Sequence, residues 1–177
     1  VAEVPSTLSE ALLLDYMLAH SADPAERVVL LQHAIDNITG TFYMQVLFAD
    51  FELQAHRLVE RDQAVTAEGL SDLYLRTVRD YFGDTIDELD EDPLTRITWA
   101  RIPHFYGTPY YVYQYATCFA STAKLIQEIR SADPVKRDAA VDRYLNLLKS
   151  GGSDHPMELL KRAGVDLSRP ETVRAVS

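Results

Sequence analysis

The chain has 177 residues, of which 47% are hydrophobic, and this suits one globular domain with a sizeable core. Its formal net charge is −10, and its basic residues are scattered. This argues against a nucleic-acid partner, because phosphate binding needs concentrated positive charge. No apolar run is long enough to span a bilayer, so we expect no membrane partner.

Hydrophobic residues recur at helical spacing along nearly the whole chain, and no bounded alternation predicts a strand. The first helix is predicted from near the first residue to about His20. Asp23 is expected to cap the next helix, with Pro24 in its first turn and Glu26 completing a capping box. The long helical stretch after it is predicted to break or kink at Gly40.

The later helices also have recognisable start and stop signals. Thr66 is expected to cap a helix that ends near "YFGD", and the acidic stretch "DTIDELDEDPLT" after it is predicted to be a solvated loop. Asp133 starts another helix, which ends at the glycines of "LKSGGSDHP". Ser153 is expected to cap a short helix closed by Gly164. The sequence therefore predicts an all-α fold, one multi-helix bundle in a single domain over residues 1–177.

Cys118 is the only cysteine, and it stands in the apolar helical context "YATCFAS". One cysteine cannot form an internal disulfide, and no histidine is near it in sequence to activate a thiol nucleophile. We therefore expect a small buried residue in a protein of a reducing compartment, the cytoplasm.

Two acidic residues near the start, Glu3 and Glu10, share one helical face, and Ser6 lies between them. A glutamate in the first turn of a helix normally complements the helix dipole. Two carboxylates on one face among Leu and Ala can also ligate a metal, or one can orient a ligand for it. From these residues alone, both interpretations of Glu3 stay open.

The stretch "RIPHFYGTPYYVYQYA", called the tyrosine loop below, gathers tyrosines beside His104 and Arg101. It holds five of the ten tyrosines of the chain: Tyr106, Tyr110, Tyr111, Tyr113 and Tyr115. Plain core packing uses Leu, Ile and Phe more readily, because a buried phenol must satisfy its hydroxyl. The cluster suits a polar cleft in which phenols donate hydrogen bonds to a developing oxyanion. An aromatic packing cluster whose hydroxyls reach solvent is equally compatible with this composition.

A third candidate lies in "FADFELQAH", where Glu52 and His56 are one helical turn apart. This spacing can hold a metal ion, but two ligands are too few, so we expect a hydrogen-bonded pair on the surface. The sequence contains no H-E-x-x-H, no P-loop and no G-x-G-x-x-G motif.

Four stretches resemble one family, the thimet-oligopeptidase-like zinc peptidases that include oligoendopeptidase F. "VAEVPSTLSEALLLDYML" and "FYMQVLFADFELQAH" resemble the segment after the zinc motif of that family. "WARIPHFYGTPYYVYQYATCFAS" resembles its substrate-binding loop and helix, and "YLNLLKSGGSDHPMELLKRAGVDLSRPE" resembles its C-terminal end. The similarity runs from Val1 to about Glu171 in the same order and with similar spacing, so several separate motifs agree.

The resemblance implies a zincin-type helical oligopeptidase, a helical bowl with a channel that admits short peptides. One zinc ion is held there by two histidines of H-E-x-x-H, whose glutamate is the general base, and by a further glutamate. The "AEVPS" segment matches the position of that third ligand, so the resemblance assigns it to Glu3.

The resemblance also assigns roles in the tyrosine loop, where a histidine and tyrosines contact the substrate and the tetrahedral intermediate. The residues matched to catalysis are His104, Tyr113 and Tyr106. The residues matched to substrate binding are Tyr110, Tyr111 and Arg101.

The sequence departs from the family pattern in one large respect. It lacks the H-E-x-x-H segment, so it contains only one of the three zinc ligands. We therefore expect the C-terminal part of a longer peptidase, which alone binds zinc weakly or not at all and is inactive. We also expect self-association into a homo-oligomer through an exposed channel wall. The alternative is a non-catalytic helical remnant or interaction module that binds peptides or a partner.

Overall fold

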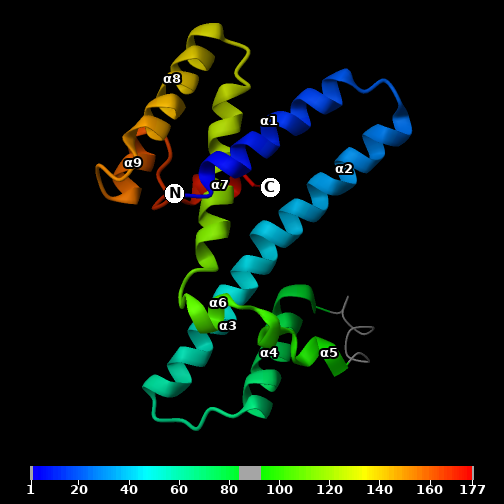
Figure 1. Cartoon of the computed structure of the whole chain (residues 1–177), viewed down its shortest axis with the longest axis vertical. Coiled ribbons are helices and arrows are strands. Elements are labelled where there is room, and N and C mark those ends of the chain that lie inside the picture. Colours follow the sequence, from blue (N-terminus) through cyan, green and yellow to red (C-terminus); the bar gives the residue numbers. More distant parts are fainter. Residues whose placement is uncertain (1, 84–92, 177) are drawn as a thin grey trace. The chain divides into compact units, whose positions relative to one another are not determined.

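The computed structural model describes residues 2–83 and 93–176, and in these ranges its regular elements are all helical (Figure 1). The predicted all-α fold is confirmed. The helices form two compact units. Unit 1 comprises Val1–Phe42 and Gln114–Ser177, and unit 2 comprises Tyr43–Tyr113. That the whole chain acts as a single domain stays a prediction.

Unit 1 contains two helical hairpins and two short C-terminal helices (Figure 1). They are α1 (Val4–His20), α2 (Pro24–Ile38), α7 (Tyr113–Ile129, all but its first residue), α8 (Pro134–Ser150), α9 (Pro156–Arg162) and α10 (Pro170–Arg174). Asp23 caps α2 by accepting a hydrogen bond from the Ala25 amide at 2.9 Å, and Asp133 caps α8 through the Val135 amide at 3.0 Å. These two predicted caps are confirmed, because the short carboxylates satisfy amides that the first helical turn leaves unpaired.

Two details of the predicted helix starts are wrong. Glu26 turns back over the start of α2, but it accepts its hydrogen bond from Ser21 Oγ, at 2.6 Å, and not from the Asp23 amide that a capping box requires. The residue that caps α9 is His155, not Ser153, and it makes no side-chain cap hydrogen bond. The helix begins at Pro156, the first residue of the predicted "PMELLKRAG" helix, and because proline suits the first helical position, the residue directly before it is the N-cap.

The core of unit 1 joins α1 to the C-terminal helices through aliphatic side chains. It contains Val4, Leu8, Cys118, Leu125, Ile126, Leu147, Leu159, Leu160, Ala163 and Val165. The Thr7 and Thr122 hydroxyls pair at 2.6 Å across α1 and α7, and Arg130 forms an ion pair with Asp15. Cys118 is 3% exposed, so the prediction of a small buried residue is confirmed, while the reducing compartment stays a prediction.

Unit 2 is a helical hairpin followed by short helical turns (Figure 1). Its elements are α3 (Met44–Glu60), α4 (Ala67–Phe82), α5 (Pro93–Arg96), a 3₁₀ turn (Thr98–Arg101) and α6 (His104–Gly107). The predicted break at Gly40 is a π-helical segment, Thr39–Tyr43, between α2 and α3 in the chain. Thr66 caps α4 as predicted, accepting from the Gly69 amide at 3.1 Å. The acidic loop prediction falls mostly on residues 84–92, which lie outside the described residues.

The core of unit 2 is aromatic, in contrast with that of unit 1. The Phe51 ring packs against Tyr74 and Phe105 at centroid distances of 5.4 Å and against Trp99 at 6.2 Å. The Trp99 indole N–H donates to Ser71 Oγ at 3.1 Å, which satisfies its one polar atom. This cluster ties α3 and α4 to the segment that begins the tyrosine loop.

Apolar side chains are exposed along α1 and α2. Leu13, Tyr16, Val28 and Val29 are 57 to 68% exposed. Within the described ranges, no helix has both the length and the apolar composition that crossing a membrane requires. The exposed side chains agree with the expectation of a surface meant to be covered, but self-association itself stays a prediction.

Candidate functional site

The tyrosine loop is fixed to the core of unit 2 at two points. The Phe105 ring packs on Phe51 at 5.4 Å and on Phe48 at 6.1 Å. Val112, seven residues after Phe105, is fully buried in the same cluster. The residues between these two apolar side chains are mostly exposed, so the core holds the ends of the segment and leaves its tyrosines near the surface.

Between those two points, α3 holds Tyr110 through Glu52 and His56. The Tyr110 amide donates to Glu52 Oε1 at 2.7 Å, and the Tyr110 ring stacks on the His56 ring with centroids 4.6 Å apart. Glu52 is 4% exposed, so the expected surface pair is wrong. The buried carboxylate accepts from a backbone amide 58 residues along the chain, which a local sequence pattern does not contain.

Tyr110 has a φ of +59°, in the left-handed region that side-chain-bearing residues rarely adopt. Such a backbone conformation costs about 1–3 kcal/mol. A hydrogen bond to a charged acceptor contributes about 1.5–3 kcal/mol, so the contact with Glu52 is large enough to offset that cost.

His104 is oriented by two neighbours within the same loop. Its ring stacks on the Tyr111 ring at a centroid distance of 5.0 Å and an interplanar angle of 18°. Its Nδ1 lies 3.1 Å from Thr108 Oγ1, within hydrogen-bonding distance. Both His104 and Tyr111 are half-buried, and these two contacts orient the imidazole.

The other predicted loop residues stay open to solvent. Tyr106 is 62% exposed, Tyr113 is 49% exposed, and Arg101 is also exposed. Arg101 lies near the buried phenol of Tyr74: burial raises the pKa of Tyr74 to about 12, and the positive charge of Arg101 opposes that rise. These exposed side chains can therefore contact a ligand without first leaving a packed core.

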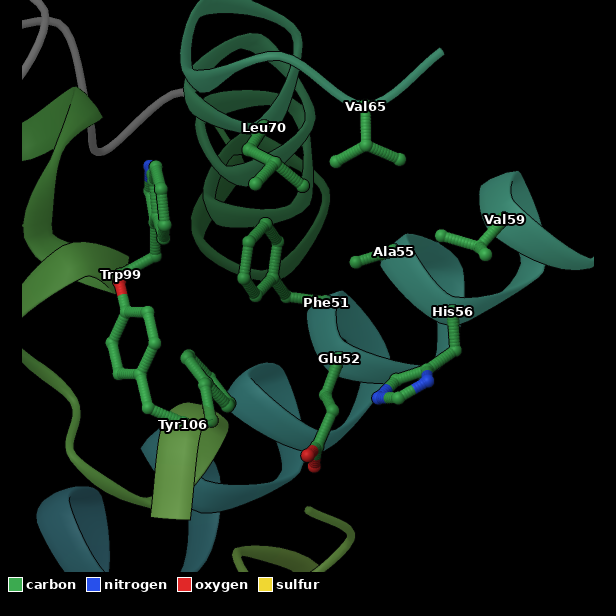
Figure 2. A pocket seen from close by; sticks show the side chains of 10 residues that line it. Phe51, Glu52, Ala55, His56, Val59, Val65, Leu70, Trp99 and Tyr106 are labelled. Atoms are coloured by element: carbon green, nitrogen blue, oxygen red, sulfur yellow. The ribbon is translucent and has the colours of Figure 1, made fainter. Parts of the chain in front are cut away.

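An apolar pocket of about 190 Å³ opens in unit 2 beside the same part of α3 (Figure 2). Figure 2 shows Glu52 and His56 next to each other on α3. The lining residues are Phe51, Glu52, Ala55, His56, Val59, Val65, Leu70, Trp99, Phe105 and Tyr106. Pockets that hold whole small ligands are about 300–1,000 Å³, so this one suits a single apolar side chain.

Glu3, the predicted zinc ligand, lies in unit 1 at the N-cap of α1. It is half-buried, and its Oε2 accepts a hydrogen bond from Ser6 Oγ at 3.3 Å. Glu10 Oε2 instead accepts from Asn37 Nδ2 of α2 at 3.3 Å. In residues 2–83 and 93–176, no group of three or more His, Cys, Asp and Glu side chains could hold a metal ion. Glu3 is chemically suited to be one ligand, but the described residues do not complete a zinc site.

The predicted site residues are divided between the two units. The loop candidates gather in unit 2, where His104 meets Tyr111 and Tyr110 meets α3. Glu3 belongs to unit 1. Within unit 2 the structure brings His104 together with Tyr111, and Tyr110 together with α3.

The contacts of Glu52 and His56 with the tyrosine loop were not predicted from the sequence. A signal was present, because Phe48, Glu52 and Ala55 follow the i, i+4, i+7 spacing of one helix face. Phe48 is in the core, so that spacing already places Glu52 on the buried face of α3.

Comparison with known proteins decides the family. Residues 1–175 match the family described as Peptidase family M3. The chain belongs to peptidase family M3. The resemblance to oligoendopeptidase F found in the sequence is thereby confirmed, and family M3 membership supports a peptidase-related function.

The relatives of this M3 chain include bacterial oligopeptidases. It is 40% identical to Oligopeptidase PepF of Bacillus subtilis (strain 168) over 176 residues, which are 99% of the chain and 25% of that protein. It is 37% identical to Group B oligopeptidase PepB of Streptococcus agalactiae, covering 99% of the chain and 28% of that protein. A crystal structure of oligoendopeptidase-F from Enterococcus faecium superposes with a TM-score of 0.84 at 38% identity, covering 98% of the chain and 32% of that structure. The chain thus spans a quarter to a third of the length of these relatives.

Proposed function

We propose that this chain supplies part of the active site of a zinc-dependent oligoendopeptidase that hydrolyses short peptides. The observation that carries the proposal is the organised tyrosine loop of an M3 family member. Its aromatic side chains stay exposed while Glu52 of α3 fixes its backbone at Tyr110. A loop held in this way can present several hydrogen-bond donors to a peptide at little cost in ordering.

The proposed cofactor is one zinc ion, with Glu3 as one of its ligands. A catalytic zinc needs three protein ligands and one open position, and Glu3 offers a half-buried carboxylate at the start of a helix. Zinc, when bound, polarises a carbonyl group and activates a water molecule. The role of Glu3 is to hold the metal and to lower the net charge of its site.

The loop residues act on the peptide itself. Tyr113, with His104 beside Tyr111, donates a hydrogen bond to the oxygen on which negative charge develops during amide hydrolysis. Tyr106 contributes to the same stabilisation. The residues proposed to hold the peptide are Tyr110, Tyr111 and Arg101.

We propose further that the 177 residues alone bind zinc weakly or not at all and do not hydrolyse peptides. They contain no H-E-x-x-H motif and therefore neither of its two histidine ligands nor its general base. One carboxylate does not hold a catalytic zinc against competition from water.

The test compares the 177-residue chain with the protein encoded by the whole gene. Zinc is measured by elemental analysis, and hydrolysis is followed with an internally quenched peptide before and after chelation. We expect one zinc per chain and chelator-sensitive cleavage only in the protein encoded by the whole gene. Zinc-dependent cleavage by the 177 residues alone would contradict their proposed inactivity. Peptide binding without zinc or cleavage in the protein from the whole gene would favour a non-catalytic helical module instead.

The exposed apolar side chains of α1 and α2 support self-association of the 177-residue chain. Sedimentation at rising concentration should show a dimer or a larger species. A strictly monomeric species at high concentration would contradict this proposal.

A further inference from the structure

Three residues from two segments of unit 2 meet at the middle of the tyrosine loop. Glu52 and His56 lie one turn apart on α3, and Tyr110 comes to them from the loop. The carboxylate of Glu52 accepts a hydrogen bond from the Tyr110 amide, with an N···O distance of 2.7 Å. The His56 ring stacks on the Tyr110 phenol ring, with ring centroids 4.6 Å apart. We call this set of three residues the Tyr110 anchor.

The identity of the anchored residue indicates a function beyond folding. At a φ of +59° glycine is the residue with the least strain, because it has no Cβ. The chain has tyrosine there, and this tyrosine remains 46% exposed. The Tyr110 ring is therefore not packed into the core: one side of it stacks on His56, and nearly half of the residue is accessible to solvent.

The anchor also restrains the residues that come next in the chain. Val112, two residues on, is fully buried in the unit 2 core, and α7 begins at Tyr113. The backbone between Tyr110 and Tyr113 is therefore held once by Glu52 and once by the core. Tyr113 follows directly on this doubly held backbone.

We propose that Glu52 and His56 are positioning residues for the reaction: they hold Tyr110 in its left-handed conformation and thereby set the tyrosine loop, Tyr113 included, for the transition state. Neither residue touches the reacting atoms. This inference rests on the proposed peptidase function, since it assigns a catalytic purpose to the geometry of the loop.

The first experiment uses two substitutions of Glu52 in the protein encoded by the whole gene. Glu52→Ala removes the acceptor, whereas Glu52→Gln keeps a side-chain carbonyl that can accept the Tyr110 amide proton. We expect Glu52→Ala to lower kcat by about ten- to a hundredfold, with a smaller change in KM, and Glu52→Gln to stay within about threefold of the wild type. Glu60→Ala, the same change at an exposed position of α3, should leave kcat unchanged.

The second readout is hydrogen–deuterium exchange of the peptide that contains Tyr110. We expect the Tyr110 amide to exchange at least about ten times faster in Glu52→Ala than in the wild type. In Glu52→Gln and Glu60→Ala it should exchange at the wild-type rate. This measurement does not depend on activity, so it also tests the anchor if the protein cleaves no peptide. In that case the proposed function fails, while selective loss of protection at Tyr110 still supports the anchor.

A second pair of variants covers the case in which Glu52→Ala does not fold. His56→Phe keeps a flat ring against Tyr110, whereas His56→Ala removes it, and only His56→Ala should lower kcat. Equal kcat values for Glu52→Ala and Glu52→Gln, or a faster exchange at Tyr110 with an unchanged kcat, would overturn the positioning role.

Discussion

Glu3 and Glu52 lie in different units and in different surroundings. Glu3 is half-buried at the start of α1, and its carboxylate accepts a hydrogen bond from Ser6, three residues along the same helix. Glu52 is 4% exposed and accepts from the backbone of Tyr110, 58 residues away in the chain. The same residue type thus makes a local contact at the start of a helix in one unit and a long-range contact that holds a loop in the other.

The largest expected effect concerns the hydrophobic cores of the two units. Phe51→Ala in unit 2 should lower the free energy of unfolding by about 3–5 kcal/mol, because it removes the ring that contacts Tyr74, Phe105 and Trp99. Leu8→Ala in unit 1 should cost about 2–5 kcal/mol. Urea denaturation followed by circular dichroism measures both.

The same pair of variants tests whether the chain is a single domain, as its sequence predicts. In one cooperative domain both substitutions lower the midpoint of the same transition. Two separate transitions, each shifted by only one of the variants, would show that the units unfold independently and would contradict the single-domain prediction.

The next effect concerns the loop that Glu52 holds. In the protein encoded by the whole gene, Tyr113→Phe should lower kcat by about 10²–10³-fold, because the developing oxyanion loses one donor. Its zinc content should not change. The matched control is Tyr16→Phe, the same chemical change on exposed α1, which should leave kcat as it is. A rate unaffected by Tyr113→Phe would remove this residue from the catalytic assignment.

A smaller effect is expected at high pH in the aromatic core of unit 2. Burial raises the pKa of Tyr74 from 10.0 to about 12. Below pH 10 the folded and the unfolded states both keep the phenol protonated. Between about pH 10 and 12 the unfolded state loses the proton first, so stability falls as pH rises, by on the order of 1–2 kcal/mol after allowance for solvent screening.

The control for this pH effect is Tyr74→Phe, which has no phenol to titrate. The unfolding free energy of wild type relative to that of Tyr74→Phe should fall as the pH rises from 10 to 12. A difference that stays constant over this range would show that Tyr74 titrates equally in both states.

The smallest effects concern helix caps, one in each unit. Thr66→Ala in unit 2 and Asp133→Ala in unit 1 should each cost about 1 kcal/mol, because each removes a hydrogen bond to a first-turn amide. Ser153→Ala should change stability by less than about 0.5 kcal/mol, since His155 caps α9 instead. A cost at Ser153 as large as at Asp133 would restore the cap predicted from the sequence.

Features that depend on residues close in sequence could be predicted from the sequence. The caps at Asp23, Thr66 and Asp133 and the break at Gly40 depend on local backbone chemistry, and the structure has all of them. The predicted cap at Ser153 is wrong because Pro156 takes the first helical position, which makes His155 the N-cap. Neighbouring signals of this kind compete, and the sequence does not rank them.

The candidate site was predictable in composition but not in geometry. The gathering of tyrosines beside His104 marks the loop, and the stacking of His104 on Tyr111 is a contact between near neighbours. The contact between Glu52 and Tyr110 joins distant segments, so it depends on how α3 packs against the loop. A local sequence pattern does not indicate how close two distant segments lie in the fold. Glu52 was therefore expected on the surface.

The most direct test of the central claim is zinc content in matched variants of the protein encoded by the whole gene. Glu3→Gln should weaken zinc binding by about a hundredfold or more, since even residues that only support a ligand contribute about 10–100-fold. Glu52→Gln should keep one zinc per chain. Full zinc occupancy and full activity in Glu3→Gln would contradict the assignment of Glu3 as a metal ligand.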